Sequence, residues 1–170
     1  CPQRSMSVDL NDDNDNDTSI SLLSMPAESD WVLMNTWNDR SLVRNPLMYQ
    51  LFGNMGHYAT RARYCEVFLD GKYWGIYQLT EKIKRDKERV DISKLKDTDI
   101  AGDSLTGGYI FKHDYTTDMS GWLSDVAPPL CPSNFARFQF VYPDSSAIKP
   151  EQLTYLRTYV DTIEDRLFKN

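Results

Sequence analysis

The chain has 170 residues, a formal net charge of −6 and a pI near 4.9. Sequence-independent binding to DNA or RNA is therefore not expected, because neutralising phosphates requires a basic face. Its hydrophobic content of 41% and aromatic content of 12% predict a folded globule rather than a disordered chain. No apolar run approaches the ~20 residues of a membrane-spanning helix. Because the chain lacks an initiator Met and a signal-peptide pattern, we expect it to be a piece of a longer protein.

The first predicted elements are two short strand-like segments around a polar turn. Residues 4–10 alternate polar and apolar side chains, as in a half-buried strand, and residues 20–25 carry the apolar side chains of a returning segment. Between them, the Asn- and Asp-rich run 11–18 predicts an Asx-type turn. A calcium loop explains this run less well, because Asn16 and Leu22 stand where such a loop has Gly and Glu.

A helix is expected next, from Asp39 or Ser41 to about Met55, with Gly56 as its stop signal. The apolar residues that recur on one face of this helix are Leu42, Leu47, Leu51 and Met55. Pro46 lacks the N–H of a helix interior, so it either kinks the helix or restarts it after a separate first turn.

A β-hairpin follows, with strands at roughly 61–69 and 73–80. The pair Asp70-Gly71 between them tolerates positive φ and predicts a type I′ turn. Further on, residues 107–114 predict another strand, and residues 116–134 are rich in Gly, Pro and Ser and predict an irregular excursion.

The end of the chain predicts a short strand at 138–142 and a helix from Pro150 to Leu167. Strands dominate the first two thirds of the sequence, with one helix among them and another at the end. The predicted fold class is α+β: a twisted antiparallel sheet with packed helices.

The densest charge follows the hairpin. Five cations fall within eight residues of an acidic chain: Lys82, Lys84, Arg85, Lys87 and Arg89. The cluster is typical of a local anion site, whereas the acids interleaved with it favour a solvated charged loop, and both interpretations stay open. The sequence contains no HExxH, Walker loop, GxGxxG or nucleophile elbow.

The four tryptophans raise a carbohydrate-binding alternative. Trp31 and Trp74 are expected in the core or half in it, and Trp37 and Trp122, in polar loops, are the candidate exposed platforms.

The histidines and Cys65 are expected to have structural roles. His57 and His113 are expected at the surface or at a strand end. Cys65 is expected to be a small buried hydrophobe, and pairing of Cys1 with Cys131 stays open.

Several blocks of the chain, in order, resemble the CotH (spore coat protein H) kinase family. They are PQRSM (2–6), LLSMPAESDWVL (22–33), DRSLVRNPLMYQL (39–51), RARYCEVFLDGKYWGIYQLTEKIKRDKERVDI (61–92) and GGYIFKHD (107–114). The resemblance implies a fold similar to the N-terminal lobe of an atypical protein kinase. It also implies use of ATP and Mg, transfer of phosphate to Ser in secreted or spore-coat proteins, and an extracellular, spore-surface or cell-surface location. The alternative is a non-catalytic surface module for adhesion or assembly, including one associated with polysaccharide degradation.

The family's later acidic, WDFD-like motif does not occur in these 170 residues. We therefore expect a partial domain over 1–170 that contains no catalytic residue or metal ligand and does not turn over alone. Its expected parts are a lobe-like sheet and helix at 1–114, an irregular excursion at 115–149, and a helix that begins the second lobe at 150–168.

The resemblance also suggests site residues by position. Glu81 and Lys82 match the family's EK pair, Arg4 lies near its usual Lys, and Arg44 matches its helix Arg. These four are the candidate nucleotide contacts, although Arg in place of Lys puts a conventional lysine role in doubt. The candidate phosphate or substrate contacts are Lys84, Arg85 and Arg89. For Arg44 and Arg89, a structural role is an equal alternative.

Overall fold

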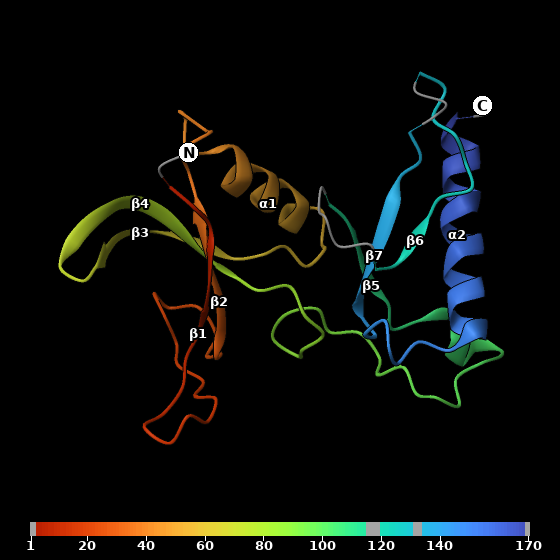
Figure 1. Ribbon diagram of the computed structural model, residues 1–170, viewed down its shortest axis with the longest axis horizontal. Coiled ribbons are helices and arrows are strands. Elements are labelled where there is room, and N and C mark those ends of the chain that lie inside the picture. The colour runs from red at the N-terminus through yellow and green to blue at the C-terminus, as the bar shows by residue number, and fades with distance from the viewer. Residues whose placement is uncertain (1–2, 115–119, 131–133, 169–170) are drawn as a thin grey trace. The chain divides into compact units, whose positions relative to one another are not determined.

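The computed structural model describes residues 3–114, 120–130 and 134–168, which form two compact units. The first unit comprises residues 1–83 and 88–90, and the second comprises 84–87 and 91–170. Each contains one antiparallel sheet and one α-helix (Figure 1), so the predicted α+β class is confirmed. The predicted division into a lobe-like part (1–114), an irregular excursion (115–149) and a helix that begins the second lobe (150–168) stays a prediction. Cys1 and Cys131 lie outside the described residues.

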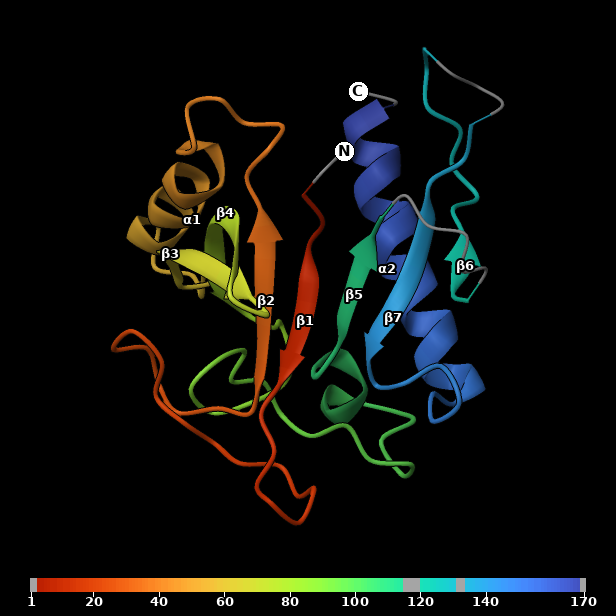
Figure 2. The same cartoon turned by 60° about the vertical axis from the view of Figure 1, so that its left-hand side comes forward.

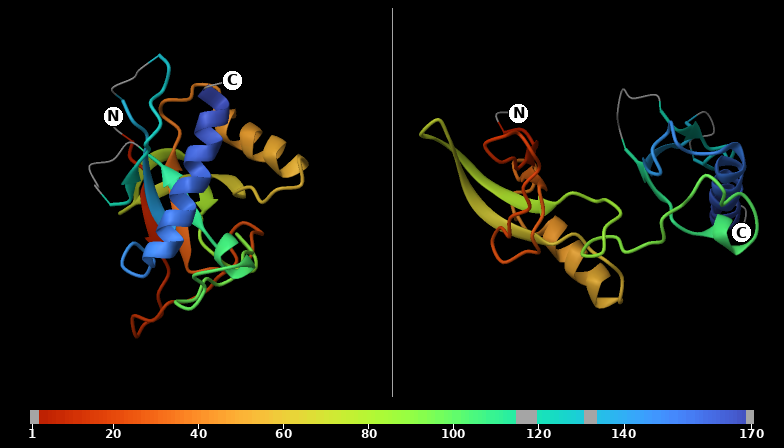
Figure 3. Two further views of the ribbon diagram at one scale, coloured as in Figure 1. Left: turned by 90° about the vertical axis from the view of Figure 1, so that its right-hand side faces the viewer. Right: turned by 90° about the horizontal axis from the view of Figure 1, so that it is seen from below.

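The first sheet has four strands in the order β1-β2-β4-β3. These are β1 (Met6–Asp9), β2 (Asp30–Asn35), β4 (Lys72–Glu81) and β3 (Ala62–Leu69). Figure 2 shows β1 and β2 side by side. Strand β2 pairs only with residues 77–81 of β4. The hairpin therefore extends past β2 and curves away from it (Figure 3).

The turn of this hairpin has the predicted conformation. Asp70 and Gly71 have φ values of 50° and 71°, which is the pair of positive φ angles that a type I′ turn requires. The strands on either side end at Leu69 and restart at Lys72. Local sequence was sufficient for the turn, whereas the register beyond it also depends on a bulge between Val67 and Phe68.

The returning strand lies later in the chain than expected. Residues 20–25 form no strand, and Ile20 makes only an isolated bridge to Glu28. The strand that pairs with β1 is β2, whose Trp31 packs with Met25 and Leu79 in the core of the unit. Leu22 and Met25 pack in the same core as Trp31, so residues 20–25 contribute to this core from a loop and not as a strand.

The predicted Asx turn is confirmed. The Oδ1 atom of Asp12 accepts hydrogen bonds from the backbone N–H groups of Asn14 and Asn16, at 2.8 and 2.9 Å. These bonds, the one from Asn16 first, lower the pKa of the Asp12 carboxyl below its ordinary value.

Helix α1 (Arg44–Asn54) begins after a separate turn, as the second of the two alternatives for Pro46 predicts. Pro46 lies in the first turn, where its missing N–H breaks no helical bond. Asp39 accepts a hydrogen bond from the Arg44 amide at 2.9 Å, so it satisfies the helix start from a distance. No residue of α1 is buried, so its predicted apolar face is exposed in the described structure.

The second unit contains a 3₁₀ helix, η1 (Asp103–Thr106), and a sheet in the order β5-β7-β6. The strands are β5 (Ile110–His113), β7 (Arg137–Tyr142) and β6 (Trp122–Leu123), and helix α2 (Pro150–Phe168) packs on one face of the sheet (Figure 2). Strands β5 and β7 and helix α2 were predicted, whereas β6 was not. Gly121 before β6 has φ of 88°, and a Cβ there would collide with the carbonyl oxygen of Phe138.

The core of this unit corrects the expectation for Trp122. It is only 5% exposed and packs with Leu156 and Val160 of α2 and with Phe138 and Phe140 of β7. It is therefore a core residue and not an exposed platform.

The outer part of α2 departs from the predicted apolar face. Ile163 and Leu167 are exposed, whereas Glu164 is buried and accepts a hydrogen bond from the Ser124 hydroxyl at 2.5 Å. Within the described part of the chain, no helix is both long enough and apolar enough to cross a membrane.

Candidate functional site

Glu81 ends strand β4 as a buried carboxylate. Its side chain has no exposed surface, and its Oε1 accepts a hydrogen bond from Arg61 Nε at 2.9 Å. Its Oε2 accepts bonds from the Arg61 amide at 3.1 Å and from the Tyr58 hydroxyl at 3.2 Å. Desolvation, and then the neighbouring Glu81, raise the pKa of Tyr58 to about 12. Glu81 is therefore fully satisfied by partners in its own unit.

Arg89 is a second buried charge at the same end of the sheet. Its side chain is 1% exposed, and its Nη1 and Nη2 atoms donate to the carbonyl oxygens of Lys82 and Asp30 at 2.6 and 2.8 Å. Its guanidinium lies 5.5 Å from the centre of the Trp31 ring and 3.8 Å, through Nε, from Glu28. Arg89 thus ties the end of β4 to the start of β2, which is the structural role left open for it.

Lys82 is the cation of this cluster with substantial exposure. Its side chain is 47% exposed, and its Nζ lies 3.6 Å from a carboxylate oxygen of Asp30. Glu81 and Lys82 therefore do not pair with each other, since neighbours along a strand point to opposite faces. We call these residues the charged network: Glu28, Asp30, Tyr58, Arg61, Glu81, Lys82 and Arg89.

The other predicted site residues lie elsewhere. Arg4 is exposed just before β1. Arg44, at the start of α1, is 78% exposed and pairs with Asp39 at 3.6 Å. Lys84 and Arg85 belong to the second unit, where the Arg85 guanidinium lies 5.3 Å from the centre of the Tyr142 ring. Within the first unit, the structure brings together Glu81, Lys82 and Arg89, but not Arg4 or Arg44.

Four members of the charged network were missed by sequence reasoning: Glu28, Asp30, Tyr58 and Arg61. Arg61 and Tyr58 precede β3, about twenty residues before their partner Glu81 in the chain. The antiparallel pairing of β3 with β4 brings them together, and the hairpin prediction contained that pairing. The predicted turn alone would have placed Thr60 opposite Glu81, because a bulge between Val67 and Phe68 shifts the register by one residue and brings Arg61 there instead.

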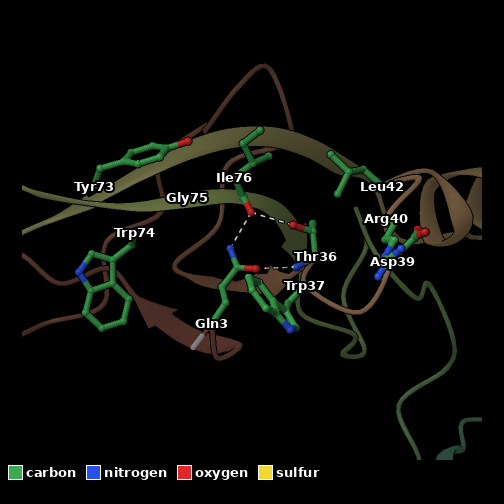
Figure 4. A pocket seen from close by; sticks show the side chains of 10 residues that line it. All are labelled: Gln3, Thr36, Trp37, Asp39, Arg40, Leu42, Tyr73, Trp74, Gly75 and Ile76. Atoms are coloured by element: carbon green, nitrogen blue, oxygen red, sulfur yellow. Dashed lines mark hydrogen bonds between the residues drawn. The ribbon is translucent and has the colours of Figure 1, made fainter. Parts of the chain in front are cut away.

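A pocket of about 440 Å³ lies at the opposite end of β4 (Figure 4). We call it the aromatic pocket; its lining is Gln3, Thr36, Trp37, Asp39, Arg40, Leu42, Tyr73, Trp74, Gly75 and Ile76. Gln3 fixes its floor by donating from Nε2 to the Ile76 carbonyl at 2.7 Å and accepting from the Thr36 amide at 3.2 Å. The Thr36 hydroxyl donates to the same carbonyl at 2.9 Å.

The tryptophans of this pocket remain largely accessible. Trp37 is 58% exposed, as predicted, and Trp74 is 42% exposed although it was expected nearer the core. The reason is that Trp74 lies on the part of β4 that extends past β2, so no strand covers it on that side.

Metal ligands do not gather in the described residues. No group of three or more His, Cys, Asp or Glu side chains there could hold an ion. In the charged network each carboxylate pairs with a cation: Glu81 with Arg61, Asp30 with Lys82, and Glu28 with Arg89. Such a donor set suits an incoming phosphate at Lys82 better than a magnesium ion.

Comparison with known proteins gives one family. No curated protein and no solved structure matches the chain. A family model described as CotH kinase protein matches residues 1–169, which is nearly the whole length of the chain. The blocks quoted above and the exposed Lys82 of the EK pair agree with this match, and the chain belongs to the CotH kinase protein family.

Proposed function

We propose that this chain forms part of a kinase domain that binds ATP and transfers its terminal phosphoryl group to Ser hydroxyls of protein substrates. The observation that carries the proposal is the family match over residues 1–169, and the exposed Lys82 supports it. Phosphoryl transfer needs cations that hold the nucleotide phosphates and spread their charge. Lys82 offers such a cation on a backbone that Arg89 holds in place.

In this proposal, Lys82 is the phosphate contact. Its ion pair with Asp30 is long and partly exposed, so it contributes little and a phosphate oxygen can replace it. Glu81 is a positioning residue, because its buried bonds to Arg61 and Tyr58 fix the end of β4. Arg4, Arg44, Lys84 and Arg85 stay predicted contacts.

Magnesium supplies charge neutralisation between the phosphates when it is bound. The described residues do not supply its ligands, so we assign no step through the metal to them. The acceptor proteins are proposed to be Ser-rich, and the location extracellular or at a spore or cell surface, because the family is associated with spore coats.

The competing proposal is a non-catalytic surface module. The exposed indoles of Trp37 and Trp74 around a pocket favour it, because large exposed aromatic side chains commonly mark binding surfaces. The two proposals differ in where ATP binds, if at all.

Titration calorimetry with Mg-ATP separates them. The whole chain is titrated beside Lys82→Ala and beside Lys72→Ala, an exposed lysine near the hairpin turn that serves as the matched control. We expect affinity to fall at least about tenfold in Lys82→Ala only, as for the loss of a charge-assisted bond. Equal affinity in all three proteins, or no binding to the whole chain, would overturn the role given to Lys82.

A further inference from the structure

The aromatic pocket holds two flat apolar surfaces that its own unit leaves uncovered. Figure 4 shows the indoles of Trp37 and Trp74 at the rim, with Gln3 between them. A volume of about 440 Å³ falls within the range of ligand pockets. An indole face favours a ligand that is itself flat and apolar on one side.

The polar side chains of the pocket differ in what they can still bind. The side chains of Gln3 and Thr36 already form hydrogen bonds with backbone groups at the floor of the pocket. Asp39 Oδ1 accepts from the Ser41 hydroxyl at 2.6 Å and the Ser41 amide at 3.0 Å, and Oδ2 accepts from the Arg44 amide at 2.9 Å. These bonds, with the Ser41 hydroxyl first, lower the pKa of Asp39. The Gln3 amide oxygen and both Asp39 carboxylate oxygens therefore already accept hydrogen bonds.

Besides the Tyr73 hydroxyl, which donates to Glu66 at 3.5 Å, the remaining polar side-chain groups are donors. Arg40 is exposed, and neither its guanidinium nor the indole N–H of Trp37 or Trp74 has a hydrogen bond or ion pair among the described residues. Arg44 pairs with Asp39 and neutralises it. The local charge at the rim is thus one net positive charge, that of Arg40, although the whole chain carries −6.

A ligand for this pocket needs a flat apolar face, oxygen acceptors around its edge and a negative charge. We propose that the aromatic pocket binds an acidic saccharide, with a hexuronate ring stacked on the indole of Trp37 or Trp74 and its carboxylate paired with Arg40. Hydroxyl groups of the sugar accept from the indole N–H groups and keep their own protons toward water. This site lies at the other end of β4 from Lys82 and does not depend on kinase activity.

Two other ligand classes fit less well. An apolar peptide side chain would cover the indoles but would leave Arg40 unpaired beside it. A nucleotide also has a flat face and a charge, but its adenine amino group needs an acceptor. The Gln3 amide oxygen and the Asp39 carboxylate already accept hydrogen bonds within the unit.

The test is calorimetric titration of the whole chain with digalacturonate and with digalactose, its uncharged counterpart. We expect digalacturonate to bind at least about tenfold more tightly, with the difference shrinking at high salt. Arg40→Gln removes the difference between the two sugars, whereas Trp37→Ala and Trp74→Ala weaken both. Phe52→Ala, an exposed aromatic residue on α1 of the same unit but outside the pocket, changes neither.

Circular dichroism of each variant checks that it is folded, and Arg40→Gln, in an exposed loop, keeps the test valid if a Trp variant unfolds. Equal binding of both sugars, digalacturonate binding that survives Arg40→Gln, or no sugar binding at all would overturn the proposal. ATP binding that is lost in Trp37→Ala would also overturn it and would identify a nucleotide pocket instead.

Discussion

The two ends of strand β4 differ in the exposure of their side chains and in how many hydrogen bonds and ion pairs these make. At Glu81, the charged groups are largely buried and are bonded to partners of the same unit. At residues 73–76, the indole of Trp74 is exposed beside that of Trp37, and the neighbouring Arg40 has no partner among the described residues. At the Glu81 end, the polar groups are therefore bonded within the fold, whereas the indoles and Arg40 at the other end are accessible to a ligand.

Lys82 differs from the other charged side chains of the network because it is accessible to a ligand. Its backbone carbonyl is held by Arg89, while its side chain is 47% exposed and only loosely paired. A fixed backbone with an accessible cation is the arrangement that a phosphate contact requires.

The largest expected effect on stability is that of Arg89→Ala. The change leaves the carbonyl oxygens of Lys82 and Asp30 without their donor, so we expect a loss of about 3 kcal/mol in the free energy of unfolding. Urea unfolding at pH 7 measures it. Arg63→Ala, an exposed arginine on β3, is the control and should stay within about 0.5 kcal/mol of wild type. Similar losses in both variants would contradict the bracing role of Arg89.

Glu81→Gln should have a smaller effect. It removes the ion pair with Arg61 but keeps the shape of the side chain, and Arg61 is partly exposed and can turn to water. We expect a loss of about 2 kcal/mol, measured in the same way. A stable variant with unchanged unfolding would show that Glu81 does not hold the end of β4.

The next prediction concerns pH. Because the folded pKa of Tyr58 is raised to about 12, its contribution to stability is complete below the ordinary pKa near 10 and is lost as pH rises toward 12. Wild type should therefore lose stability over this interval more steeply than Tyr58→Phe. Urea unfolding between pH 9 and 11 gives the slopes, and equal slopes in both proteins would mean that burial and Glu81 do not raise the folded pKa of Tyr58.

Lys82→Ala should change stability least. The side chain is exposed and its single ion pair with Asp30 is long, so the free energy of unfolding should move by less than about 0.5 kcal/mol. Thermal unfolding checks this, and a large loss would make Lys82 a structural residue like Arg89.

Sequence reasoning succeeded where the structure is local. The turn at Asp70-Gly71, the Asx turn at Asp12 and helix α2 each follow from neighbouring residues. The candidate site was predicted only in part. Lys82 was found through the EK pair, whereas its relation to Arg89 depends on two segments that meet only in the folded unit.

The errors share a physical cause. Trp122 looked exposed because its loop is polar, but α2, some thirty residues later, covers it. Strand β2 was missed because Trp31-Val32-Leu33 is a continuous apolar run, and such a run does not show the alternation of a half-buried strand. In both cases the partners that decide burial are remote in sequence.

The most direct test of the difference between the two ends of β4 is ¹H–¹⁵N NMR of the indole N–H groups during two titrations. Trp31 lies against Arg89 near Lys82, Trp37 and Trp74 line the aromatic pocket, and Trp122 is the control in the second unit. We predict that Mg-ATP shifts Trp31 and that digalacturonate shifts Trp37 and Trp74. ATP shifts confined to Trp37 and Trp74 would contradict the account, because the nucleotide would then bind at the end of β4 that we assign to the sugar.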